Sequence, residues 1–180
     1  MTRLVILDRD GVINADSPNY IKSVDEWKAL PGSLEAIGRL TRAGYTVVVA
    51  SNQSGLGRGL FDADSLAAIH RKMRSEIKAA GGDLAGIFFC PHTPEQGCAC
   101  RKPRAGLFRQ IAEKFALSLE GVPAIGDSKR DLEAARRVGA RPILVLTGNG
   151  QETLDSGEAG VEVYKDLGAA ADTLIGETLT

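Results

Sequence analysis

The sequence predicts an α/β fold built in three layers, with helices on both faces of a doubly wound, mostly parallel sheet. Two observations predict it. Short apolar segments alternate along the whole chain with longer segments of helical periodicity. The apolar segments also lack the alternation of a half-exposed strand, so we expect strands that are buried on both faces, as in a parallel sheet.

The expected elements follow one another in chain order. Strands are expected at 4–7, 46–50, 86–90, 122–125, 142–146 and, with a weaker pattern, 161–164. Helices are expected between them at 33–43, 63–80, 105–115, 129–138 and 167–175. In the first of these, Leu34, Ile37 and Leu40 lie three positions apart and form one apolar stripe. Gly44 and Gly139 directly follow helices, where glycine readily adopts a left-handed cap conformation. The stretch 148–160 is expected to be a surface loop or a short helix.

The length and composition of the chain exclude some classes of function. The 180 residues suit a single domain over 1–180. Lys and Arg number 22 against 23 Asp and Glu, no basic run occurs, and aromatic residues are few, so we expect no nucleic-acid or membrane surface. The first apolar stretch has only five residues and no cleavage site behind it, which argues against a signal peptide. We therefore expect a cytoplasmic protein with a small-molecule partner, and a monomer.

Polar side chains gather where the predicted strands end. Asp8 and Asp10 follow the first strand, Ser51 ends the second, and Asp127 follows the fourth. Ligands of parallel sheets bind beyond these carboxyl ends. Residues two apart in extended backbone point to the same side, so Asp8 and Asp10 are expected to face one pocket. Two acidic groups this close suit a bound divalent cation, a nucleophile paired with a proton carrier, or both.

Two further segments offer groups for a phosphate. The loop 52–59 is rich in glycine and hydrogen-bond donors, and it is either a phosphate cradle or an ordinary glycine-rich turn. Lys102 lies just before Pro103 and a predicted helix start, where anions are favoured. Asp131 follows Asp127 by four residues, so it is expected one helical turn away as a supporting acid.

Taken in order, the Asp-x-Asp-Gly, strand-end Ser, Lys and Gly-Asp-x-x-x-Asp segments resemble the four motifs of the haloacid dehalogenase superfamily. The resemblance implies a Rossmann-like core and phosphoryl transfer through an aspartyl-phosphate. Asp8 would be the nucleophile, and Asp10 would protonate the leaving oxygen and then activate water. Asp8, the backbone carbonyl of Asp10 and Asp127 would hold Mg²⁺, while Ser51 and Lys102 would hold the transferring phosphoryl group.

The residues also indicate which branch of the superfamily to expect. An Asp at position 10 suits phosphatases, because a dehalogenase needs no acid to protonate halide. About forty residues separate Asp10 from Ser51, and a single helix and loop fill them. The interval from Ser51 to Lys102 is filled by a helix, a strand and a loop. We therefore expect an open phosphatase site without a separate cap domain.

All three cysteines and one of the two histidines fall within residues 90–100. Three thiolates and one imidazole are a common ligand set for Zn²⁺ in proteins. Four protein ligands leave no open position, so we expect a structural zinc loop rather than a catalytic metal. The loop leads directly to Arg101 and Lys102, so a clamp there would fix both residues. The expected zinc ligands are Cys90, His92, Cys98 and Cys100.

The motif segments and the cysteine loop together closely resemble the heptose 1,7-bisphosphate 7-phosphatases. That resemblance implies removal of the C7 phosphate from D-glycero-D-manno-heptose 1,7-bisphosphate, in the synthesis of nucleotide-activated heptose for lipopolysaccharide. The loop 16–20 would contact the sugar, and Arg101, with Arg58, would face the retained phosphate. The residues expected to contact substrate are Asp16, Tyr20, Asn52, Gln53, Ser54, Arg58, Arg101 and Ser128.

Other readings stay open at this point. Histidinol-phosphate phosphatases share the cysteine loop, although their cationic substrate disfavours extra arginines. A zinc-stabilised binding module would have no need of the catalytic set, and a phosphatase of nucleic-acid ends would favour a basic surface. Ala105, the long 16–20 loop and Ser51 in place of Thr depart from the family pattern, and the anomer at C1 is left open.

Overall fold

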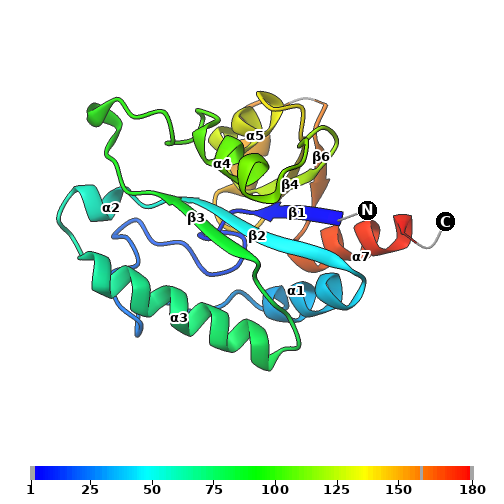
Figure 1. The fold of residues 1–180 in the computed structure, drawn as a ribbon, viewed down its shortest axis with the longest axis horizontal. Coiled ribbons are helices and arrows are strands. Elements are labelled where there is room, and N and C mark those ends of the chain that lie inside the picture. The colour runs from blue at the N-terminus through cyan, green and yellow to red at the C-terminus, as the bar shows by residue number, and fades with distance from the viewer. Residues whose placement is uncertain (1–2, 159, 179–180) are drawn as a thin grey trace.

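The computed structural model of the protein describes residues 3–158 and 160–178. Six parallel strands form one sheet in the order β3-β2-β1-β4-β5-β6 (Figure 1). The expected α/β class and parallel sheet are thus confirmed. Observed strand ends lie within two residues of the expected ones. The strands are β1 (Arg3–Leu7), β2 (Tyr45–Asn52), β3 (Gly86–Cys90), β4 (Pro123–Gly126), β5 (Arg141–Val145) and β6 (Glu162–Tyr164).

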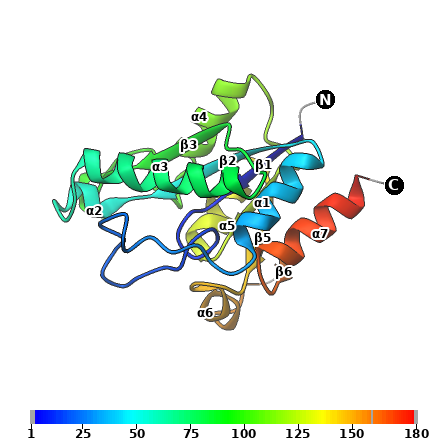
Figure 2. The ribbon, with the colours of Figure 1, turned by 90° about the horizontal axis from the view of Figure 1, so that it is seen from below.

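Helices cover both faces of the sheet, as predicted. Helices α1, α3 and α7 pack on one face and α4 and α5 on the other (Figure 1), and Figure 2 looks onto the first of these faces. Two clusters of buried apolar residues fill the two interfaces. The helices are α1 (Ser33–Arg42), α2 (Ser54–Gly57), α3 (Ala63–Ala79), α4 (Gly106–Phe115), α5 (Lys129–Arg136), α6 (Gly150–Asp155) and α7 (Leu167–Glu177), with a 3₁₀ turn at Pro94–Gln96.

Local chemistry explains several of these boundaries. The Asp62 carboxylate accepts from the backbone N–H of Ser65 and begins α3. Gly44 and Gly139 have φ of 86° and 72°, which confirms the expected left-handed conformations after α1 and α5. In the described part of the stretch 148–160, which is 148–158 and 160, α6 is a short helix with flanking turns. The single-turn α2 and the 3₁₀ turn were not predicted, because so few residues carry no periodic signal.

The strand order reverses between β1 and β4, and this places the site. Register pairs Leu7 with Val49 of β2 and Ile125 of β4, so Asp8 leaves the sheet beside the ends of both neighbours. In open α/β sheets the crevice at such a switch point binds ligands. The described residues contain one sheet and no separate cap domain, and none of their helices is long and apolar enough to cross a membrane.

Candidate active site

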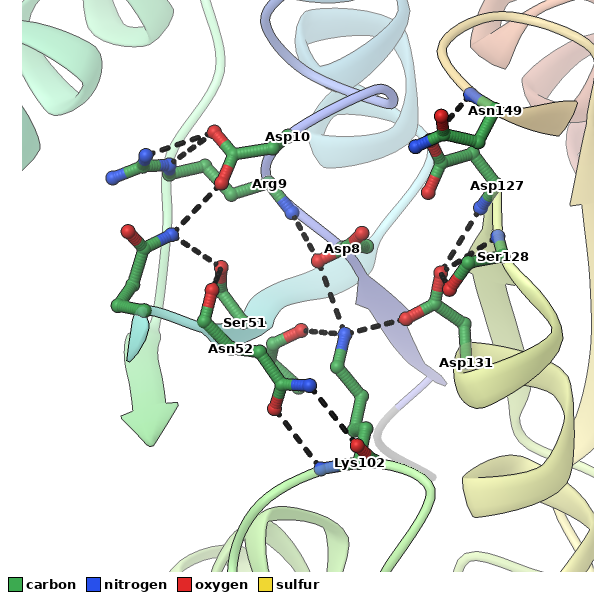
Figure 3. Close-up of polar contacts among 12 residues, drawn as sticks. Asp8, Arg9, Asp10, Ser51, Asn52, Lys102, Asp127, Ser128, Asp131 and Asn149 are labelled. Atoms are coloured by element: carbon green, nitrogen blue, oxygen red, sulfur yellow. Dashed lines mark hydrogen bonds and ion pairs between the residues drawn. The ribbon is translucent and has the colours of Figure 1, made fainter. Parts of the chain in front are cut away.

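A buried lysine joins two carboxylates at the centre of this crevice (Figure 3). Lys102 Nζ donates to Asp8 Oδ1 at 3.0 Å, to Asp131 Oδ1 at 2.6 Å and to the carbonyl of Ala50 at 2.7 Å. Only 2% of Lys102 is exposed. Because all three donors of the ammonium have partners, the charge lies in one position beside Asp8.

The charges of Lys102, Asp8 and Asp131 shift one another's pKa values. Burial raises the pKa of Asp8 well above its usual value, and the neighbouring Asp131 adds to the effect. Burial would also raise the pKa of Asp131, but the charge and hydrogen bond of Lys102, together with the hydrogen bonds from Ser128, more than offset it, so that pKa lies below its usual value. Burial would lower the pKa of Lys102, and the two carboxylates reverse this and raise it. Lys102 therefore stays charged at neutral pH.

Asp127 is the third acid of the cluster, and two glycines bracket its carboxylate. A Cβ on Gly11 or Gly148 would lie 2.0 or 2.2 Å from Asp127 Oδ2, and both glycines have positive φ. Asp127 Oδ2 accepts from the backbone N–H of Asn149 at 2.8 Å. Burial, followed by the charge of Asp131, raises the pKa of Asp127 to about 7.

The donor set fits a hard divalent cation. Carboxylate oxygens of Asp8, Asp127 and Asp131 lie within 4.8 Å of one another, and Mg²⁺ prefers such ligands. Both oxygens of Asp131 already accept hydrogen bonds, from Lys102, Ser128 and the N–H of Asp127. Asp131 therefore supports the cluster, and Asp8 and Asp127 are the better placed ligands. The Asp10 side chain lies outside the cluster.

Asp10 is held by nitrogen donors on both oxygens. Its Oδ1 accepts from Arg9 Nε at 2.9 Å, from Arg9 Nη2 at 2.8 Å and from Asn14 Nδ2 at 2.8 Å. Its Oδ2 accepts from Gln53 Nε2 at 2.9 Å. Figure 3 shows this carboxylate turned towards Arg9 and away from Asp8. The two motif acids thus flank the pocket, as the spacing predicts, with separate partners.

The two polar residues that end β2 make protein contacts. Ser51 is fully buried, and its hydroxyl accepts from Gln53 Nε2 at 2.8 Å. The Asn52 amide accepts from Lys102 N at 2.9 Å and donates to Lys102 O at 3.0 Å. Asn52 was expected to contact substrate, but both the oxygen and the nitrogen of its amide bond the backbone of Lys102.

These groups line a pocket of about 350 Å³. Asn149, Arg130 and Ile21 also line it and were missed from the sequence. The strand-end triplet 147–149 after β5 is the signal that would have found Asn149. The predicted residues on the pocket wall are Asp8, Asp10, Asp16, Tyr20, Asn52, Gln53, Ser54, Arg58, Arg101, Lys102, Asp127 and Ser128. Ser51 is buried and is not among the lining residues.

Three arginines give one side of the pocket a positive charge. Arg58, Arg101 and Arg130 all line it, and Nη1 of Arg101 is buried without a hydrogen-bond partner. Burial, followed by the nearby Arg130, lowers the pKa of Arg101. A buried guanidinium nitrogen without a partner is costly, so this side of the pocket fits an anion.

The predicted sulfur and nitrogen ligands meet beside the pocket. Cys90 Sγ lies 3.0 Å from Cys100 Sγ and 3.5 Å from Cys98 Sγ, while His92 Nδ1 lies 3.2 Å from Cys100 Sγ. All four donor atoms fall within 4.8 Å of one another. Three thiol sulfurs and one imidazole nitrogen this close together fit a metal ion with tetrahedral coordination.

Comparison with known proteins identifies the family. A HAD-hydrolase-like family model matches residues 99–170, and a polynucleotide kinase 3 phosphatase model matches residues 4–129. The D-glycero-beta-D-manno-heptose-1,7-bisphosphate 7-phosphatase of Bordetella bronchiseptica is 56% identical over 97% of this chain and 99% of its own length. The chain belongs to this family of haloacid dehalogenase-like phosphatases. The Pseudomonas putida enzyme of the same name is 51% identical over 96% of the chain and 99% of its own length.

Solved structures agree with this assignment. The B. bronchiseptica D,D-heptose 1,7-bisphosphate phosphatase, complexed with magnesium and phosphate, covers 98% of this chain and 99% of its own, with a TM-score of 0.95 at 56% identity. The Burkholderia thailandensis enzyme covers 97% of this chain and 99% of its own, with a TM-score of 0.76 at 46% identity. The resemblance found in the sequence is thereby confirmed, as is the uncapped core.

Proposed function

We propose that the protein hydrolyses the C7 phosphate of D-glycero-D-manno-heptose 1,7-bisphosphate in a Mg²⁺-dependent reaction. The observation that carries the proposal is the complete acid and lysine set in one pocket, in a chain that aligns over almost its whole length with phosphatases of that name. The three arginines suit a substrate with a second phosphate. The product would be the heptose 1-phosphate needed for nucleotide activation.

The chemistry follows from the two acids of the first motif. A carboxylate oxygen of Asp8 bonds to phosphorus while the bond from phosphorus to the C7 oxygen breaks. Asp10 gives its proton to the leaving oxygen and then takes one from water, whose oxygen attacks phosphorus and frees Asp8. Lys102, fixed beside Asp8, stabilises negative charge on the phosphoryl group. The chemistry that Mg²⁺ supplies, when held by Asp8 and Asp127, is neutralisation of charge on the reacting oxygens.

Ser51 has a less direct place in this scheme. Its hydroxyl lies under the Gln53 amide, which also bonds Asp10 Oδ2. The hydroxyl accepts from that amide and donates, at 3.4 Å, to the carbonyl of Asn52, so its O–H can turn to a phosphoryl oxygen at Asp8 while the Gln53 bond remains. We propose that substrate displaces the Gln53 amide from Asp10 Oδ2, which frees that oxygen for proton transfer.

The arginine side of the pocket is proposed to hold the phosphate that is retained at C1. The unpartnered Nη1 of Arg101 and the adjacent Arg58 and Arg130 supply planar donor groups, which bind phosphate oxygens in pairs. Ser54, Ser128 and the loop carrying Asp16 and Tyr20 would contact the sugar. A cationic amine in place of the second phosphate would face like charge here, which disfavours histidinol phosphate.

We propose that the cysteine cluster binds structural Zn²⁺. Cys98 Sγ accepts from the backbone N–H of Arg101 at 3.3 Å, so a metal here would tie the loop to the start of the catalytic segment. The four donors leave no position for substrate. We also propose that the chain acts as a single-domain monomer, which light scattering would test.

The test of the function compares kcat/KM for heptose 1,7-bisphosphate and histidinol phosphate, with Mg²⁺ present. We expect a strong preference for the bisphosphate, with one phosphate released per sugar and the C1 phosphate signal retained in the ³¹P NMR spectrum. Asp8→Asn should fold normally and release no phosphate. A preference for histidinol phosphate would overturn the substrate assignment and the role given to the arginines.

A further inference from the structure

Arg9, between the two motif acids, is a buried charge that the scheme above does not use. Its side chain is 0% exposed, and two of its nitrogens donate to the same oxygen of Asp10. A buried guanidinium is costly unless its donors have partners, so this pair needs a defined geometry. The third nitrogen, Nη1, points elsewhere.

That third nitrogen meets His70 of α3. Arg9 Nη1 lies 3.2 Å from His70 Nε2, and both side chains are buried. Arginine only donates hydrogen bonds, so Nε2 must accept, and the imidazole proton sits on Nδ1. Burial, together with the charge of Arg9, lowers the pKa of His70 to about 4, which keeps the ring neutral and able to accept.

The imidazole is itself held in place. Its ring packs against Phe89 of β3, with ring centroids 5.8 Å apart and planes tilted by 58°. Both residues line a groove of about 300 Å³ between α3 and β3, which is separate from the substrate pocket. Among the described residues, neither His70 nor Arg9 lines the substrate pocket, and the contacts of Arg9 link His70 to Asp10.

We propose that His70 is a positioning residue that acts through Arg9 to hold Asp10 for proton transfer. The inference rests on the proposed phosphatase function. Three N–H donors, two from Arg9 and one from Asn14, occupy Asp10 Oδ1. The proton that moves to the leaving group and back from water is therefore carried by Oδ2. Without the acceptor on His70, the guanidinium loses one of its three anchors, and Asp10 Oδ2 loses its fixed direction.

His70→Leu and His70→Gln separate this role from simple packing. Leucine fills the space without an acceptor, whereas the glutamine amide oxygen can accept from Arg9. We expect His70→Leu to lower kcat about tenfold or more with KM unchanged, because a small displacement of a catalytic group has effects of that size. His70→Gln should restore most of kcat. Arg71→Gln, an exposed neighbour in the same groove, should behave as wild type.

A second readout isolates the step that needs Asp10 as a base. Nitrophenolate leaves without protonation, so p-nitrophenyl phosphate phosphorylates Asp8 without help from Asp10, and only hydrolysis then requires it. His70→Leu should therefore show a larger initial burst of nitrophenolate than wild type. Equal bursts and an unchanged kcat, in an enzyme whose wild type is active, would overturn the positioning role. A wild type that released no phosphate from the bisphosphate would instead overturn the proposed function.

Discussion

Replacing Asn52 by alanine tests whether this residue serves Lys102 or the substrate. The Asn52 side chain accepts from the N–H of Lys102 and donates to its carbonyl, at 2.9 and 3.0 Å. These two bonds fix the backbone from which the ammonium reaches Asp8. Asn52→Ala removes both and leaves two polar groups of Lys102 to find water.

The size of the effect follows from those contacts. Loss of two hydrogen bonds of about 1 kcal/mol each should lower the free energy of unfolding by about 2 kcal/mol. For a chain of this size, that corresponds to a fall in Tm of about 4–8 °C. The ammonium of Lys102 would also lose its fixed position, so kcat should fall by roughly tenfold to a hundredfold.

Thermal unfolding and steady-state kinetics measure the two effects on the same samples. Gln151→Ala is the matched control, because it also removes an amide, but one that is exposed and bonds only Asp155. It should change stability by less than about 0.5 kcal/mol. An Asn52→Ala protein with wild-type Tm and a raised KM alone would refute the reasoning and make Asn52 a substrate contact.

Three further predictions concern parts of the molecule away from Asn52. Removal of metal by a chelator should lower Tm, and Zn²⁺ but not Mg²⁺ should restore it. Activity assayed with Mg²⁺ present should return only after Zn²⁺ is added back, and an unchanged Tm would contradict a structural zinc. Gly148→Ala should raise the Mg²⁺ concentration needed for half-maximal activity, because the added Cβ would push on the Asp127 carboxylate. A Mg²⁺ titration like that of the wild type would contradict this role of Gly148. Hydrogen bonds from Arg141 lower the pKa of Glu162 and Glu177, so their stabilisation is full above about pH 4.3 and is lost as pH falls through the lowered values. Arg141→Gln should therefore cost about 1 kcal/mol at pH 7, with a deficit that closes below about pH 4; a constant deficit in unfolding scans would contradict this.

The fold could be predicted because its signals are local. Continuous apolar runs mark strands that are buried on both faces, and glycines such as Gly44 and Gly139 mark helix ends. The same logic placed Asp8 and Asp127 at one edge of the sheet, since both directly follow strands. Short elements such as α2 were not predicted, because a single helical turn is too short to show a repeating pattern of apolar residues.

The partners within the site could not be predicted, because they depend on contacts between distant segments. His70 is 61 residues from Arg9, and in a sequence it looks like any histidine on a helix. Asn52 lies in a loop that suggests phosphate binding, yet its amide fits the backbone of Lys102, 50 residues away. Motif order identifies which residues react, and only the folded chain shows what holds them.

Trapping the phosphorylated enzyme tests the central claim most directly. The enzyme is quenched during turnover of heptose 1,7-bisphosphate and treated with borohydride, which reduces an acyl phosphate to homoserine, and its peptides are sequenced by mass spectrometry. Asp10→Asn, given p-nitrophenyl phosphate, whose leaving group needs no proton, should enrich the trapped form because it lacks the base for hydrolysis. We predict homoserine at position 8 alone. Modification at Asp10 or Asp127, or phosphate release with no trapped residue in either protein, would contradict nucleophilic attack by Asp8.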